Sequence, residues 1–459
     1  MKADVPAGTP TQLPDASIQG IPELQTIAHP VPLTLGTIFR LAEDQNAQIA
    51  LSRAKIDESY ASKELADKAW LPQISIGADW FRHEGGIANQ DGTLQRSSFG
   101  GFLIGGDMTG KLDLKDAIYQ RFVAERQVLQ QKGELRRVTT ETLLDAANTY
   151  IDLLAARTGE AMASEAKKQI ETLLERAQRA ASAAPEAAVE VARLRAALRG
   201  REQMIAQLQE QAARASAKLV YLLGVDSGAS IVVADDHLVP LDLIDPAKPV
   251  ADLVNQALTT GPGIQEMERM LALIEEGICQ ANGPTKYLPI MEMHMLEGAF
   301  GVGPGGSTSW DNRFDLGLQV RWDLTQLFTQ QERQHVMRAR TEQAHLTYRD
   351  LRGKLTAGVQ EGHESVVHGK EQIHLGEQAI AEAQNAQKLT EDRLNAHVAG
   401  VTYSEILQSQ QATAMAQAGY LAAVHSYNQA QLRLFLLTGS TGHDVPCAGN
   451  CATTTIKPE

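Results

Sequence analysis

A glutamate and a histidine one helical turn apart form the clearest chemical motif in the sequence. The stretch "EGHESVVHGKEQIH" places Glu364 four residues before His368, so both side chains would share one face of a helix. Such a pair could bind a metal ion, but a zinc site needs at least three protein ligands and no third one lies on the same stripe. We therefore interpret the pair as part of a solvated helix face and expect no metal site.

Three acidic residues lie beside two predicted helical turns, and these are Glu186, Glu190 and Glu405. Under threefold symmetry they could form rings at the mouth of a tunnel, and rings of carboxylates favour cations in channels. Ordinary surface charge explains them as well, because the sequence does not show which face of each helix points inward.

No set of residues is typical of an enzyme. The sequence lacks a Ser/His/Asp set at usable spacing and paired carboxylates in a catalytic context. The glycines at 85–106 and 301–306 fit hairpin loops, and "GVGPGG" is not a nucleotide-binding fingerprint. We expect neither enzymatic activity nor a cofactor.

Composition limits the class of partner. A formal net charge of −14 makes a nucleic-acid partner unfavourable, because phosphate binding needs a basic patch. The chain is 43% hydrophobic but only 5% aromatic, which is typical of helices packed side by side. No run reaches the roughly 18 apolar residues of a transmembrane helix, so any contact with a bilayer would involve strands. The N-terminus shows no apolar segment of a signal peptide, so the chain is either cytosolic or begins without its export signal.

The chain has three cysteines, which are too few for a disulfide scaffold. Cys279 lies in a helical stretch, while Cys447 and Cys451 form a C-x3-C pair in the tail. The tail pair could form a disulfide in an oxidising compartment or remain two plain cysteines.

Two prolines mark a change from helix to strand. In "KAWLPQISIGADW" the residues before Pro72 have a helical pattern, and apolar and polar residues alternate after it. "TKYLPIMEMHML" repeats the change at Pro289. Proline disfavours helix at the preceding residue and lacks an amide donor. We predict that Trp70 and Pro72, and likewise Tyr287 and Pro289, form two helix-to-strand joints.

The same order of elements occurs twice: two short helices, two strands, a very long helix and a return helix. The first repeat is predicted over 33–226, with strands at about 73–83 and 97–108, and the second over 249–440, with strands at about 290–300 and 312–323. A connector over 227–248 joins the two repeats. An extended arm over 1–32 precedes them and a disordered tail over 441–459 follows them. The return helices end in "VYLLGV" and "LFLLTGS", where the glycine is a C-terminal cap signal. The predicted fold class is mainly α with a small β part.

Four strands in two hairpins need a partner, because isolated hairpins are marginal in water and open edges need pairing. A membrane barrel assembled from several chains would supply it, with apolar residues facing lipid and polar residues facing water. Strand alternation then places five residues toward the lumen: Asp79, Asp315, Gln319, Arg321 and Asp323. Three tryptophans fit either an interfacial girdle or ordinary packing: Trp80, Trp310 and Trp322.

From about residue 33 to 440 the chain resembles the outer membrane efflux protein family, the TolC-like channels. The resemblance rests on the duplicated order of elements and on the opening segment with its W-L-P. It also rests on two helical hairpin turns, "RAQRAASAAPEAAVEVARLRAAL" and "RLNAHVAGVTYSEILQSQQA". The closing helix "AAVHSYNQAQLRLFLLTGS" is similar to that of the family as well. The first turn has Ala180 and Ala181 where the family has a glycine, and the second turn is lengthened.

The resemblance implies a homotrimer in which each chain gives four strands to a twelve-stranded barrel in the outer membrane and its helices to a periplasmic tunnel. It implies a passive exit duct for drugs, metals or proteins, working with a periplasmic adaptor and an inner-membrane pump in tripartite efflux or type I secretion. A soluble periplasmic coiled-coil scaffold and a non-conducting paralogue are the alternatives.

Overall fold

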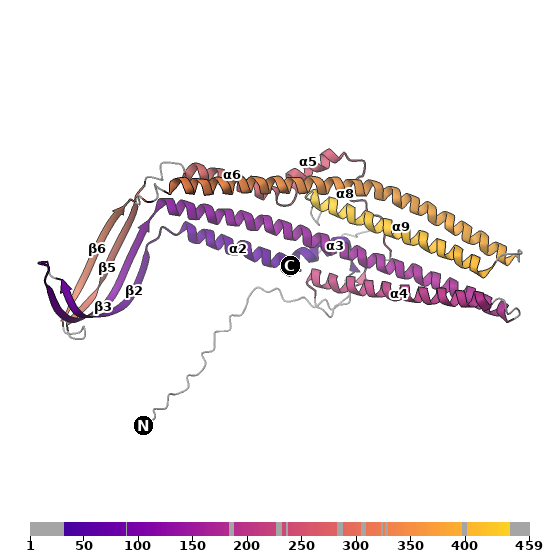
Figure 1. Cartoon of the computed structure of the whole chain (residues 1–459), viewed down its shortest axis with the longest axis horizontal. Coiled ribbons are helices and arrows are strands. Elements are labelled where there is room, and N and C mark those ends of the chain that lie inside the picture. Colours follow the sequence, from indigo (N-terminus) through magenta and orange to yellow (C-terminus); the bar gives the residue numbers. More distant parts are fainter. Residues whose placement is uncertain are drawn as a thin grey trace, which may run out of the picture. The chain divides into compact units, whose positions relative to one another are not determined.

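The structure is a computed structural model that describes residues 32–88, 90–182, 188–225, 232–235, 237–281, 288–303, 309–322, 325, 329–396 and 402–440. The described chain is mainly helical with one four-stranded antiparallel sheet, as predicted (Figure 1). It forms two compact units. Unit 1 comprises Met1–Ala47, Asp145–Val239 and Ala379–Leu421, and unit 2 comprises Gln48–Leu144, Pro240–Gln378 and Ala422–Glu459. None of the described helices is long and apolar enough to span a lipid bilayer.

The predicted duplication of elements is confirmed. The first half contains α1 (Leu35–Gln45), α2 (Ala47–Asp67), β2 (Gln73–Ala88), β3 (Leu94–Leu112), α3 (Leu114–Ala181) and α4 (Ala188–Leu223). The second half contains α5 (Val250–Thr260), α6 (Ile264–Ala281), β5 (Ile290–Gly303), β6 (Ser309–Arg321), α8 (Gln330–Asn395) and α9 (Tyr403–Leu437). The long helices α3 and α8 have 68 and 66 residues, so the two proline-free stretches each form one continuous helix.

The strands of the first hairpin are longer than the sequence predicts. β2 continues to Ala88 and β3 begins at Leu94, through a glycine-rich stretch that the sequence assigns to a loop. There Gly85 pairs with Ser97 and Gly86 with Arg96. Pairing between strands supplies backbone hydrogen bonds that outweigh the low strand preference of glycine. In the second hairpin β5 starts at the predicted residue, whereas β6 begins at Ser309 and ends at Arg321.

A short parallel pair of strands was not predicted. β1 (Pro32–Leu33) pairs with β4 (Val232–Val233), which lies in the connector. The buried side chain of Tyr150 on α3 supports this pair, because its hydroxyl donates to Asp235 Oδ2 at 2.6 Å and lies 3.0 Å from the Leu33 carbonyl oxygen. Burial, followed by the neighbouring carboxylate of Asp235, raises the pKa of Tyr150.

In unit 1 the junction between α1 and α2 contacts the end of α4. The buried side chain of Asn46 donates a hydrogen bond to the Leu222 carbonyl at 2.8 Å. Gly224 follows α4 with a φ of +62°, and a Cβ there would lie 2.4 Å from the Gln45 carbonyl oxygen. Only glycine fits this left-handed position and close approach without strain.

In unit 2 the junction between α5 and α6 has the equivalent contact with the end of α9. The Thr260 hydroxyl donates to the Thr438 carbonyl at 2.8 Å. Gly439 has a φ of +80°, and a Cβ there would lie 2.2 Å from the Thr260 carbonyl oxygen. The predicted glycine caps of both return helices are therefore confirmed, and each cap also carries a contact between helices.

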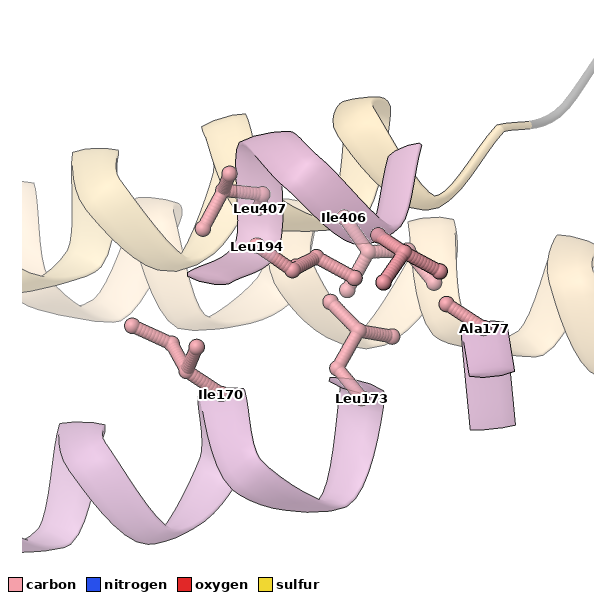
Figure 2. Close-up of a cluster of buried hydrophobic side chains, with 7 residues drawn as sticks. Ile170, Leu173, Ala177, Leu194, Ile406 and Leu407 are labelled. Atoms are coloured by element: carbon pink, nitrogen blue, oxygen red, sulfur yellow. The ribbon is translucent and has the colours of Figure 1, made fainter. Parts of the chain in front are cut away.

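Thin hydrophobic seams hold the helices together. In unit 1 the buried side chains of Ile170 and Leu173 on α3 meet Leu194 on α4 and Ile406 on α9 (Figure 2). On α4 the side chains of Leu194 and Leu219 are fully buried, so this helix packs through a narrow apolar stripe. In unit 2 α8 approaches α9 through glycines, and Gly362 and Gly369 lie against Leu434 and Tyr427.

Candidate channel-lining face of the sheet

The four strands form one sheet in the order β2-β3-β5-β6 with a continuous antiparallel register. Residues opposite one another in antiparallel strands point to the same side, and successive residues along a strand point to opposite sides. The register therefore assigns every paired residue to one of two faces. For example, Trp80, Phe102 and Trp310 share one face.

We call this first side the apolar face. Its members include Ile74, Ile76, Ala78, Trp80, Phe102, Ile104, Met108, Met291, Met293, Met295, Ala299, Trp310, Phe314, Leu316, Leu318 and Val320. Glu297 and Asn312 interrupt it, and toward the end of the first hairpin it continues into the polar residues Arg82, Glu84, Arg96 and Ser98. Near the hairpin ends the rings of Phe102 and Trp310 meet edge to face with centroids 5.8 Å apart. Many of these side chains are exposed, which is unusual for a large apolar patch on a water-soluble surface.

The opposite side, which we call the polar face, contains the predicted lumen-facing residues. Asp79 on β2 and Asp315, Gln319 and Arg321 on β6 all lie on it. Asp323 lies outside the described residues. The structure thus brings four of the five onto one side of the sheet, and their exposure to a lumen stays a prediction.

Charged and polar pairs link neighbouring strands on the polar face. Ser75 donates a hydrogen bond to the Asp107 carboxylate, and Arg321 pairs with Glu292. Within β6, Arg313 pairs with Asp315 at 2.7 Å. Opposite charges on adjacent strands stabilise one register over its alternatives.

Sequence reasoning missed several charged residues of this face, among them Asp107, Lys111 and Glu292. Lys111 lies directly opposite Glu292 in the register. The alternation of methionine with Glu292 and His294 in "MEMHM" could have identified β5 as two-faced. The corresponding signal in β3 is weaker, because glycines occupy several positions of both faces.

The described parts of the two joints lie at the starts of the strands. Pro72 directly precedes β2 and Pro289 directly precedes β5. Trp70 follows the end of α2 and is exposed, whereas Tyr287 lies outside the described residues. Of the three candidate girdle tryptophans, Trp80 and Trp310 lie on the apolar face and Trp322 is exposed just after β6.

The acidic residues beside the helical turns have partners within the chain. At the start of α4, Glu190 accepts a hydrogen bond from Ser404 of α9, and Arg193 donates to the same serine hydroxyl at 3.1 Å. Glu405 lies 3.5 Å from Arg393 of α8. Glu186 lies outside the described residues. These contacts join helices near the turns, and whether the carboxylates also form rings stays a prediction.

The Glu364 and His368 side chains lie on an exposed part of α8. They are 64% and 73% exposed, and His368 Nε2 is 3.6 Å from Glu364 Oε2. The described residues contain no group of three or more histidine, cysteine or acidic side chains arranged to hold a metal ion. The exposed fractions agree with a solvated helix face, and the expectation of no metal site stays a prediction.

A comparison with protein families supports the assignment of the fold. Residues 38–225 match the family model described as outer membrane efflux protein. The predicted resemblance to the outer membrane efflux protein family is confirmed. No curated protein sequence matches the chain.

Solved structures of outer-membrane channels share the fold of this chain. The outer-membrane channel OprN superposes with a TM-score of 0.73 at 16% identity, covering 89% of this chain and 90% of that one. The Campylobacter jejuni CmeC outer membrane channel gives 0.70 at 15% identity over 88% and 85% of the two chains. The outer membrane protein VceC from Vibrio cholerae gives 0.69 at 13% identity over 89% and 96%. The fold is that of TolC-like channels.

Proposed function

We propose that this protein is the outer-membrane channel component of a tripartite efflux or type I secretion system. It would act as a passive exit duct for small molecules, metals or proteins. Three copies would each contribute four strands to one twelve-stranded barrel in the outer membrane, and the helices would form a tunnel in the periplasm. A periplasmic adaptor and an inner-membrane pump would be the partners, and the pump would supply the energy.

The two-faced sheet is the observation that carries this proposal. On β6 the apolar face runs from Val320 to Trp310, a distance of ten residue steps along the strand. At ~3.3 Å per residue and a strand tilt of about 40°, this corresponds to a height of about 25 Å. That height equals the apolar band of outer-membrane barrels, and aromatic residues lie at one rim of the band.

The open edges of the sheet support an assembly of several chains. Within the described chain, β2 and β6 are the outer strands, and each pairs on one side only. Long unpaired edges with apolar side chains invite further pairing. Pairing β6 of one copy with β2 of the next would use both edges and close the ring.

The two alternative functions, a soluble scaffold and a non-conducting paralogue, predict different surroundings for the sheet. A soluble coiled-coil scaffold would expose the apolar face to water, which is unfavourable at about 25 cal/mol per Å² of apolar surface. A non-conducting paralogue would keep the barrel but block the path. Single-channel conductance in planar bilayers separates this last alternative from an open duct.

The test is purification of the full chain, expressed with an export signal, from the outer-membrane fraction in detergent. We expect the mass of a trimer, a β contribution in circular dichroism and discrete current steps in planar bilayers. A monomer with almost no β signal would contradict the proposal and support the scaffold. A trimer with β signal and no current steps would indicate the non-conducting paralogue.

A further inference from the structure

The polar face changes character along the strands. Near the joints it carries the polar side chains Gln73, Ser75, Asp107, Thr109, Glu292, His294, Gln319 and Arg321. The next row has three glycines on adjacent strands, Gly77, Gly105 and Gly298. Beyond that row, toward the hairpin ends, large apolar side chains lie beside polar ones, and Asp79 and Asp311 share a row with Leu103 and Phe300. We call five of the apolar side chains the aromatic collar: Phe81, Phe99, Leu103, Phe300 and Val302.

The collar is packed rather than scattered. Phe81 and Phe99 meet edge to face with ring centroids 6.0 Å apart. The ring of Phe81 covers Gly101, since a Cβ at this glycine would lie 2.3 Å from the ring. His83 lies against Phe99 with centroids 5.5 Å apart, and the Arg313 guanidinium lies 5.2 Å from the Phe300 ring. Neighbouring groups therefore hold the three phenylalanine rings in place.

Apolar side chains on this side of the sheet need an explanation, because the other face already supplies the lipid contact. From this geometry we propose that the large side chains of the aromatic collar narrow the channel at its hairpin end and slow solutes entering from that end. The inference rests on the proposed function, because it requires the polar face to line a closed ring.

The dimensions of such a ring make the collar effective. Twelve strands spaced ~4.8 Å apart and tilted by about 40° give a backbone radius of about 12 Å. Three chains would project nine phenylalanine side chains into this space, three from each chain. Pore diameter is one determinant of what a channel admits, so these side chains would hinder solutes of comparable width. The glycine row beneath, which lacks side chains on three of four strands, would be wider.

The proposal predicts a difference between the two ends of the channel. A cysteine beneath the glycine row would react slowly with a charged reagent added from the hairpin end, because the collar lies between them. Ser75 is a suitable position, since it lies on the polar face and serine to cysteine is a small change. The native Cys279, Cys447 and Cys451 are replaced by serine in the S75C parent and in every variant made from it.

The experiment measures the rate at which a positively charged methanethiosulfonate modifies S75C channels in a planar bilayer, read as a change in current. We expect F81S/F99S to raise the rate from the hairpin end at least tenfold and to leave the rate from the helical end unchanged. F81L/F99L keeps large side chains in the collar and should react like the parent. F102S makes the same chemical change on the apolar face and should also react like the parent.

The outcomes separate the two proposals. Equal rates from the hairpin end in the parent and F81S/F99S would overturn the collar while leaving the channel intact. An equal increase in F102S would also overturn it, because loosening of the sheet would then explain the effect. If S75C channels conduct but no reagent reaches the cysteine from either end, the polar face does not line the channel. Protein that forms no conducting trimer would contradict the proposed function itself.

Discussion

The side-chain amide of Asn46 donates a buried hydrogen bond to the Leu222 carbonyl, 2.8 Å away, and so joins the α1–α2 junction to the end of α4. In the second repeat the Thr260 hydroxyl contacts the Thr438 carbonyl at the same distance. Different side chains thus make the same connection at equivalent places. We infer that the contact between a helix junction and the end of a return helix is a structural requirement of each repeat.

Replacing Asn46 by alanine should lower the stability of the protein. The Leu222 carbonyl would lose its side-chain donor in a buried site, and an unsatisfied buried polar group costs about 1–3 kcal/mol. Thermal or urea unfolding of the purified full chain measures the effect. Asn255→Ala on the exposed side of α5 is the matched control and should leave stability within about 0.5 kcal/mol. Equal effects of both variants would contradict the role of the buried bond.

Replacing either capping glycine by alanine should be more severe. Gly224 and Gly439 have positive φ angles, and the left-handed conformation costs a residue with a Cβ about 1–2 kcal/mol. The new methyl group would also collide with a backbone carbonyl, so we expect a loss larger than this range. Gly200→Ala in α4 has open space around the new Cβ and should stabilise the helix by about 0.5–1 kcal/mol. A neutral effect at Gly224 or Gly439 would show that the junctions adapt.

The contact between Tyr150 and the β1–β4 pair should make stability depend on alkaline pH. The pKa of Tyr150 is raised in the folded state, mainly by burial, so the folded chain binds the phenolic proton more tightly than the unfolded chain. The resulting stability is fully present below the unfolded pKa of about 10 and is lost as the pH rises above it.

Urea unfolding of the wild type and Tyr150→Phe at pH 7.5 and pH 10.5 tests this dependence. At pH 7.5 we expect the variant to be less stable by about 1–3 kcal/mol, because Leu33 and Asp235 lose the hydroxyl. At pH 10.5 the difference should shrink. A difference that grows or stays constant with pH would contradict the assignment.

Local signals explain what the sequence predicts well. Proline at 72 and 289, glycine after each return helix and long proline-free stretches all act within a few residues, so the order of elements follows from them. Non-local pairing explains what it misses. The extension of β2 to Ala88, the pairing of β1 with β4 and the contact of Glu190 with Ser404 each depend on a distant segment.

Some residues of the polar face could likewise be predicted from a single strand, and others could not. Alternation within β2 and β6 was sufficient to select Asp79, Asp315, Gln319 and Arg321, because a side chain's face follows from its position along one strand. Asp107 became visible only through the register, because glycines dilute the alternation in β3. The alternation in "MEMHM" could have identified Glu292 from the sequence.

The most direct test of the polar face concerns its charge. Asp79 lies on this face, opposite Leu103 on β3. If the face lines the channel, three copies of Asp79 would form a ring of carboxylates, and such rings favour cations. Asp79→Asn should therefore lower the preference for potassium over chloride, measured as a zero-current potential closer to zero in a potassium chloride gradient.

Glu297→Gln supplies the control for this prediction, because it removes one carboxylate from the opposite, apolar face. We expect its zero-current potential to equal that of the wild type, since the charge would lie outside the ion path. A shift in Glu297→Gln without one in Asp79→Asn would mean that the faces are reversed, with the apolar side turned inward. Because the register fixes both residues to opposite sides of one sheet, the two variants together decide which side faces the moving ions.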